Sequence, residues 1–106
     1  MAKNIFQQII NKEAPAKFLY EDSDYIIINN KYPKAPIHYL VIPKKSIQSI
    51  KTLEDHDRDI VGGMFTLASK FAKEQNIEDY KLVFNCGIHQ DIPHLHLHFL
   101  AGKLAR

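Results

Sequence analysis

Cysteine is almost absent from the sequence. Cys86 is the only one among 106 residues, which excludes an internal disulfide and a zinc site built on paired cysteines. A single thiol fits a reducing compartment, in which disulfides are rare. Its simplest interpretation is a small buried hydrophobic residue. The pattern is not that of a secreted protein held together by disulfides.

Long apolar runs and concentrated charge are lacking as well. The first residues, MAKNIFQQII, contain no apolar stretch of signal-peptide length, and no segment approaches the roughly 20 apolar residues of a membrane span. We therefore expect a cytoplasmic protein without a membrane partner. The 14 basic and 12 acidic residues are interspersed and give a net charge of +2. Without a basic tract, we expect no nucleic-acid partner.

The remaining composition is that of a globular protein. With 45% hydrophobic residues in 106, the chain is long enough for one core, so we predict a single domain over residues 1–106. Apolar spacing predicts a short helix within 4–13 and a long amphipathic helix over about 53–75. Five strands are predicted at 17–21, 25–29, 38–43, 80–85 and 94–101. The third strand is nearly all apolar and should be central. We predict an α+β fold with a mainly antiparallel, five-stranded sheet.

The last predicted strand contains three histidines at alternate positions, in the segment PHLHLHFLAG. With six histidines in the chain, chance supplies such a pattern on the order of 2% of the time. On a strand, His94, His96 and His98 share one face, about 6.6 Å apart between neighbours, and Leu95, Leu97 and Phe99 take the core face. Three adjacent imidazoles repel one another once protonated and pack poorly, so we interpret the row as functional.

Two chemistries suit this row. Neutral imidazoles two residues apart can share a zinc ion, but His94 and His98 are too far apart on a straight strand to reach the same ion. A zinc site then needs a ligand from elsewhere, such as His38. The second chemistry is phosphate transfer, in which one imidazole attacks while another binds oxygens or assists the departing group. Imidazole suits this because it is neutral and nucleophilic near pH 7.

Four further polar residues are candidates to join the histidines. They are His38 at the start of the third strand, Asn85 at the end of the fourth, Asn30 in the loop before the third, and Asp91. Each also has a plain structural interpretation, as a satisfied histidine, a turn residue or a solvated loop acid. The spacing alone leaves these alternatives open.

The segment HLHLHFL resembles the His-φ-His-φ-His-φ-φ signature, with φ apolar, of the histidine triad (HIT) superfamily of nucleotide hydrolases and transferases. The similarity continues through IFQQIINKEAPAKFLYEDSDYIIINNKYPKAPIHYLVIPKK, which resembles the Hint branch of dimeric nucleoside phosphoramidases. Most of the chain is covered. The resemblance implies a homodimer, a purine nucleoside monophosphate derivative as substrate, and no cofactor or metal.

The resemblance also implies roles for individual residues. His96 would be the nucleophile that attacks the α-phosphate and becomes a nucleotidyl-histidine. His98 would contact the phosphate and assist the leaving group, and His94 and His38 would orient and tune the nucleophile through hydrogen bonds. Asn85 matches an asparagine near the phosphate. Since attack needs a neutral ring with one free nitrogen, we expect the other nitrogen of His96 to donate to a backbone carbonyl.

Two positions, Asn30 and Asp91, depart from the Hint pattern, and a third, Ile28, is expected to line the pocket. Asn30 stands where that branch usually has an aspartate that holds the ribose hydroxyls, so the charge is missing here. Ile28 is expected in the wall of the base pocket. Asp91 occupies a position that is often serine or glutamate, and an acid there repels a phosphate unless it points away.

We therefore expect a hydrolase that acts at the α-phosphate of nucleoside phosphoramidates or related nucleotides. The alternatives within the same chemistry are a dinucleoside polyphosphate hydrolase and a nucleotidyl transferase. The alternatives from other functional classes are a zinc-binding protein and a nucleotide-binding protein without turnover.

Overall fold

The computed structural model describes residues 3–102 and contains the predicted α+β fold. The secondary structure follows the chain order α1, β1, β2, β3, α2, β4, β5. The bounds are α1 Ile5–Ile10, β1 Tyr20–Glu21, β2 Tyr25–Asn29, β3 Ile37–Pro43, α2 Arg58–Glu74, β4 Tyr80–Val83 and β5 Leu97–Ala101. Short 3₁₀ turns lie at Ile50–Thr52, Asp55–Asp57 and Gly87–His89.

The five strands form one antiparallel sheet in the order β1-β2-β3-β5-β4. The prediction that β3 is central is confirmed. Its register with β5 places His38 opposite Leu100 and Leu40 opposite His98. Since residues two positions apart on a strand share a face, His38 and His98 lie diagonally across from each other on the same side of the sheet.

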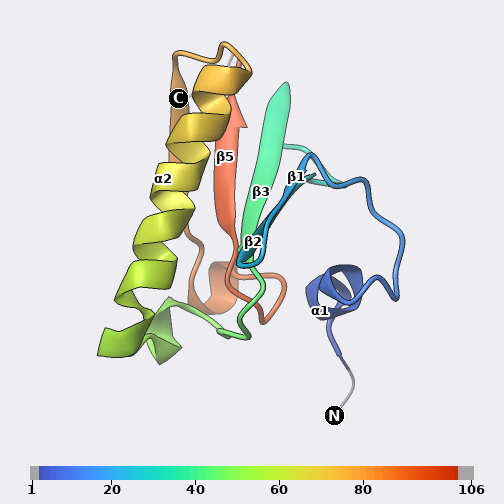
Figure 1. Ribbon diagram of the computed structural model, residues 1–106, viewed down its shortest axis with the longest axis vertical. Helices are drawn as coiled ribbons and strands as arrows, with labels where there is room; N and C mark the ends of the chain where they lie inside the picture. Colours follow the sequence, from blue (N-terminus) through green and yellow to red (C-terminus); the bar gives the residue numbers. More distant parts are fainter. Residues whose placement is uncertain (1–2, 103–106) are drawn as a thin grey trace.

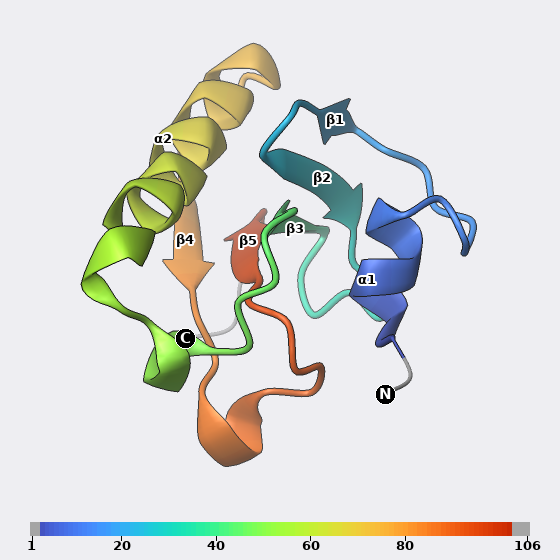
Figure 2. The same cartoon turned by 60° about the horizontal axis from the view of Figure 1, so that its bottom comes forward.

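The sheet is covered on both faces. Helix α2 lies against one face and α1 against the other, as the two views show (Figures 1 and 2). On the α2 side the core includes Leu97 and Phe99 of β5, together with Met64 and Phe71 of the helix. On the α1 side, Phe6 and Ile9 pack with buried residues of β2 and β3. This double burial explains why the strand YIIIN is apolar at successive positions rather than alternating.

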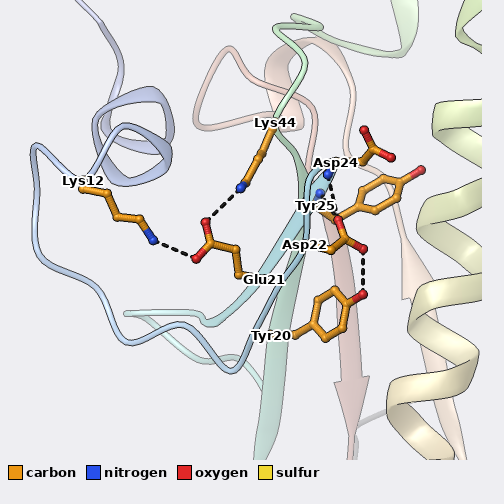
Figure 3. A network of polar contacts seen from close by, with 7 residues as sticks. All are labelled: Lys12, Tyr20, Glu21, Asp22, Asp24, Tyr25 and Lys44. Atoms are coloured by element: carbon orange, nitrogen blue, oxygen red, sulfur yellow. Dashed lines mark hydrogen bonds and ion pairs between the residues drawn. The ribbon is translucent and has the colours of Figure 1, made fainter.

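The β1–β2 hairpin is held by the side chain of Asp22. Its Oδ1 accepts hydrogen bonds from the backbone N–H groups of Asp24 and Tyr25, at 2.7 and 2.8 Å, and Tyr20 donates its hydroxyl to Oδ2 at 2.6 Å (Figure 3). Side-chain to backbone bonds of this kind fix tight turns. Strand β1 is shorter than predicted, since only two of its residues join the ladder.

Helix α1 is anchored beside the histidine segment. Asn4 accepts from the backbone N–H of Gln7 at 3.0 Å, and Gln7 accepts from the N–H of Asn4 at 3.1 Å, which forms a reciprocal capping pair. The amide of Asn4 also donates to the carbonyl of Pro93 at 3.3 Å. The cap that starts the helix therefore also ties it to the turn that precedes His94.

The prediction that all three histidines lie on a strand is wrong, although Leu95, Leu97 and Phe99 do take the core face. Strand β5 begins at Leu97, so only His98 of the three lies on it. The N–H of His94 donates to the Ile92 carbonyl, and that of Leu95 donates to the Ile47 carbonyl at 2.7 Å, away from the sheet ladder. Because α1 covers this face, His94 and His96 are only 1% and 7% exposed.

The second helix also begins later than predicted, at Arg58 instead of about residue 53. Asp57 explains this start, because its carboxylate accepts from the N–H of Glu54 at 3.0 Å and from the ammonium of Lys45 at 2.6 Å. These bonds hold the preceding residues in a 3₁₀ turn. Neither helix in the described part of the chain has both the length and the apolar character needed to cross a membrane.

Replacing each of the two adjacent glycines of α2 with alanine should change the free energy of unfolding in opposite directions. A Cβ on Gly63 would lie 2.0 Å from the hydroxyl of Tyr25, which donates to the Ile60 carbonyl, whereas a Cβ on Gly62 would meet no atom within 4 Å. We expect Gly63→Ala to lower the free energy of unfolding by about 1–3 kcal/mol through overpacking. Gly62→Ala should raise it by about 0.5–1 kcal/mol. Urea denaturation measures both, and equal effects would contradict the close packing of Tyr25.

Candidate active site

A cavity of about 750 Å³ lies where α1, the loops around β2 and the histidine segment meet. We call it the histidine cavity. Its lining comes from α1 (Ile5, Phe6, Ile9), the loop after it (Pro15, Ala16, Lys17), β2 and its following loop (Ile28, Asn29, Asn30, Lys31, Tyr32, Lys34), Leu40, Asp91, Ile92, His96 and His98. Its volume is within the range of small-molecule sites. A smaller cavity of about 590 Å³ lies beside Lys12 and Glu21 and has no histidine in its lining.

His96 presents one free ring nitrogen to this cavity. Its Nδ1–H donates to the backbone carbonyl of His94 at 2.7 Å, so the neutral ring keeps its lone pair on Nε2. The expected bond from His96 to a backbone carbonyl is thereby confirmed. The ring of Phe6 packs edge-on against it, with 4.9 Å between centroids.

Burial keeps His96 neutral near pH 7. Desolvation lowers its pKa below the usual 6.5, and this effect outweighs the bond to the His94 carbonyl and the charge of Asp91, which both raise the pKa. A buried imidazole that is neutral, oriented and open at Nε2 has the properties of a nucleophile. The arrangement needs no further base to activate it.

The imidazole of His94 does not contact His96 by a hydrogen bond. Its Nε2–H donates to the Pro43 carbonyl at 2.7 Å, and its Nδ1 is buried without a partner within the described residues. Burial lowers its pKa. His94 therefore joins the end of β3 to the turn before β5, and it orients His96 through its backbone carbonyl. His94 thus has the expected hydrogen bond to the nucleophile, but from its backbone carbonyl and not from its imidazole.

His38 contacts His98 rather than His96. The backbone N–H of Lys34 donates to Nδ1 of His38 at 3.0 Å, so the proton of the neutral ring lies on Nε2. That Nε2 lies 2.9 Å from Nδ1 of His98 and donates to it. The proton of neutral His98 is then on Nε2. A single backbone N–H thus fixes the proton positions of two histidines.

Asn85 completes this chain outside the lining of the histidine cavity. Its amide nitrogen lies 3.2 Å from Nε2 of His98. Because Nε2 of His98 is a donor in this proton order, Asn85 satisfies it by rotating its amide to present the oxygen. Burial lowers the pKa of His98 to about 4, with contributions from neighbouring His96, His38 and Lys34. His98 is therefore a neutral hydrogen-bond donor at pH 7.

The positive charge of the site comes from lysine, since all four histidines have lowered pKa values. Burial is the main cause at His38, and Lys34 adds to it. Lys34 also lowers the pKa of His98, while Asp91 raises the pKa of both His96 and His98. A cation and an anion therefore both act on His98. An anionic ligand is attracted by the first and repelled by the second.

The structure brings most of the predicted site residues together. Ile28, Asn30 and Asp91 line the histidine cavity with His96 and His98. Asn30 also lies 3.2 Å from Nε2 of His38 through its amide nitrogen. Within residues 3–102, no group of three or more histidines, cysteines and carboxylates is arranged to hold a metal ion.

Sequence reasoning missed Phe6 and three lysines of the cavity, Lys17, Lys31 and Lys34. Phe6 belongs to the apolar spacing that predicts the first helix, and that spacing does not indicate a place in a cavity. The loop NKYPKAP carries two of the lysines next to Asn30, and this proximity in sequence is the one signal that pointed to them. Lys17 has no such signal.

Known proteins resemble the chain over nearly its full length. Residues 3–105 match the family described as scavenger mRNA decapping enzyme C-term binding. An uncharacterized HIT-like protein from Buchnera aphidicola subsp. Baizongia pistaciae is 40% identical over 97% of this chain and 96% of its own length. The structure of a histidine triad protein from Clostridium difficile is 37% identical with a TM-score of 0.93, covering 100% of this chain and 97% of that one. A HIT family hydrolase from Legionella pneumophila Philadelphia 1 is 33% identical with a TM-score of 0.91, covering 95% and 94%.

The buried histidines should make stability depend on pH. Each of the four has a lower pKa in the folded chain than its usual 6.5, so the unfolded chain binds more protons once the pH falls below that value. We expect the melting temperature to decrease as the pH is lowered from 7 to 5. Replacing the histidine with the pKa of about 4, His98→Asn, should make this decrease shallower.

The matched control is His56→Asn, which removes an exposed histidine of the 3₁₀ turn before α2. Its melting temperature should follow the wild-type pH dependence. If His98→Asn and His56→Asn gave the same slope between pH 7 and 5, the burial of neutral His98 would be contradicted.

Proposed function

Because the chain belongs to the histidine triad superfamily and is of its hydrolase-like kind, we propose that it hydrolyses nucleotides at the α-phosphate through a nucleotidyl intermediate on His96. Nucleoside phosphoramidates are the proposed substrates, in line with the resemblance to the Hint branch. The observation that carries the proposal is the bond from Nδ1–H of His96 to the His94 carbonyl, which leaves Nε2 free in the cavity.

In the first step, Nε2 of His96 forms a bond to phosphorus and the bond from phosphorus to the amine nitrogen breaks. The amine leaves after taking up a proton from solvent water, and His96 becomes a nucleotidyl-imidazolium. The carbonyl of His94 stabilises this cation, because its bond to Nδ1–H becomes charge-assisted. In the second step water attacks phosphorus and loses a proton to the solvent, the bond to Nε2 breaks, and neutral His96 and the nucleoside monophosphate are released.

His98 and Lys34 are proposed to hold the phosphate. His98 is proposed to turn its Nε2–H from Asn85 to a phosphate or leaving-group oxygen when the substrate binds, and its low pKa keeps it neutral when the anion is absent. Lys34 acts electrostatically on His38 and His98 and supplies positive charge next to them. Asn85 contacts His98 from outside the cavity lining. We therefore assign the leaving group to the side of Asn85.

The nucleoside is proposed to occupy the histidine cavity. Ile28 of β2 is buried in its wall, and α1 adds Ile5 and Phe6. An apolar wall suits a flat purine base, and the polar loop after β2 suits the sugar. Asp91 is proposed to restrict how the phosphate lies, since its charge acts on both His96 and His98.

We propose that the protein forms a homodimer through β4, the strand at one edge of the sheet. Strand β4 is the last strand of the order, and Leu82 and Val83 are only partly buried there. The exposed ring of Phe65 on α2 packs against Phe84, which follows that strand. An apolar edge strand is a pairing surface, and a two-fold axis would let two copies of β4 pair with each other.

Replacing the proposed nucleophile should separate chemistry from binding. We expect His96→Ala to lose essentially all turnover of adenosine 5′-phosphoramidate, because no other ring presents a free Nε2 in the same place. Binding of adenosine monophosphate should weaken by no more than about tenfold, or about 1.4 kcal/mol, because it draws on other contacts. Steady-state kinetics and isothermal titration calorimetry measure the two effects.

His94→Ala and His98→Ala serve as comparisons and should retain measurable rates, since neither provides the attacking atom. Wild-type rates in His96→Ala would overturn the proposal. Assay of the wild type with EDTA and then with added zinc distinguishes the zinc alternative: activity should persist in EDTA, and loss with recovery on zinc would favour a metal mechanism.

The dimer should be visible in solution. We expect equilibrium sedimentation at micromolar concentration to give twice the chain mass. Val83→Lys, at a partly buried position of the edge strand, should shift the protein toward monomer by placing charge on the pairing surface. The exposed Lys81 on the same strand offers a control, since Lys81→Gln should leave the mass unchanged. A monomer mass for the wild type would remove the proposed dimer.

A further inference from the structure

The histidine cavity carries more positive charge than one phosphate requires. Three lysines line it, Lys17, Lys31 and Lys34, and Asp91 is the only acid in the lining. The lysines around the neighbouring cavity and at the end of β3 are instead paired, as in Lys12–Glu21, Lys44–Glu21 and Lys45–Asp57. Within residues 3–102, Lys17 and Lys31 form no ion pair with a carboxylate, so their charge is available to a ligand.

The three lysines act on different parts of the cavity. Lys34 is close enough to the histidines to lower the pKa of His38 and His98. Lys17 and Lys31 perturb none of the four histidines, and they come from the loop after α1 and from the end of β2. We call these two the distal lysines. Lys34 therefore supplies positive charge beside the histidines, and the distal lysines add charge from other segments of the cavity lining.

Asn30 adds a hydrogen-bond donor next to Lys31. Its Oδ1 accepts from the backbone N–H of Tyr32 at 2.9 Å, which fixes the orientation of the amide. Its Nδ2 lies 3.2 Å from Nε2 of His38, but that nitrogen already carries a proton directed at His98. Two donors do not bond to each other. The Nδ2 hydrogens of Asn30 are thus left for a ligand with acceptor oxygens.

We propose that the nucleoside part of the substrate carries a second phosphate, on its sugar, which binds to Asn30 and the distal lysines. The proposal rests on the proposed function, because it takes the reacting phosphate to lie at His96 and His98. The base has no charge, and the leaving group is assigned to the side of Asn85, outside the cavity lining. The sugar is the part of the ligand that remains to meet the distal lysines.

The combination of donors matches a phosphate better than a sugar diol. A dianionic phosphate accepts charge-assisted bonds from ammonium groups and an amide at once, whereas a hydroxyl is neutral and bonds more weakly. The cavity volume of about 750 Å³ is large enough for a nucleotide with an additional phosphate. Asn30 and the distal lysines are thereby specificity residues rather than catalytic ones.

The test compares adenosine 5′-phosphoramidate with its 2′-phosphate and 3′-phosphate derivatives. We expect the wild type to prefer one of the sugar phosphates by about tenfold or more in kcat/KM, the effect of one or two charge-assisted bonds. The double variant Lys17→Gln/Lys31→Gln should reduce this ratio to near one. The matched control Lys70→Gln/Lys73→Gln removes two exposed lysines of α2, and it should keep the wild-type ratio.

Equal kcat/KM for the three substrates in the wild type, or a preference that survives in the Lys17→Gln/Lys31→Gln variant, would overturn the inference. Calorimetry with adenosine monophosphate and with adenosine 2′,5′- and 3′,5′-bisphosphate separates it from the proposed function. If none of the phosphoramidates is turned over, the proposed function fails, and tighter lysine-dependent binding of a bisphosphate still supports the second phosphate site. If binding shows no such preference, the inference fails whatever the turnover.

Discussion

The hydrogen bond from Nδ1–H of His96 to the carbonyl of His94 is the interaction on which the site depends. It fixes the tautomer, so that the free lone pair lies on Nε2. It requires a backbone that leaves the sheet ladder before Leu97, which the bond from the Leu95 N–H to the Ile47 carbonyl provides. It also requires burial beside α1, where Phe6 packs against the ring, and this burial lowers the pKa of His96. The position of the His94 carbonyl, which the fold determines, therefore sets the chemistry available to His96.

Much of the fold could be predicted, because its signals are local. The β5 residues Leu97 and Phe99 alternate as expected and pack on the α2 side. The extent of that strand could not be predicted, since alternation in HLHLHFL continues past the point where backbone pairing ends. Whether Leu95 bonds to the sheet or to a loop is decided by Ile47, 48 positions earlier in the sequence. The alternation of histidine and apolar residues does not indicate which partner the Leu95 N–H will bind.

The site, like the fold, could be predicted from the sequence only in part. The histidine spacing pointed to a cluster, and the structure brings His96 and His98 to one cavity. The chemistry of attack required a donor bond at His96, which the structure contains. The partners of the other rings followed from tertiary structure: His94 bonds to Pro43, and His38 bonds to His98 because the β3–β5 register places them diagonally. The cavity lysines were missed because a surface lysine and a ligand-binding lysine look alike in sequence. Only the fold brings Lys17 and Lys31 into the lining of one cavity.

The account's central claim is that Nε2 of His96 becomes covalently bonded to the nucleotide during turnover. Rapid chemical quenching of the wild type with a slow phosphoramidate, followed by mass spectrometry of the peptide that contains the three clustered histidines, tests this most directly. The account predicts one added nucleotidyl group, formed at the rate of amine release and mapped by fragmentation to His96. An adduct on His94 or His98, or amine release without any adduct on a substrate whose second step is slow, would contradict it.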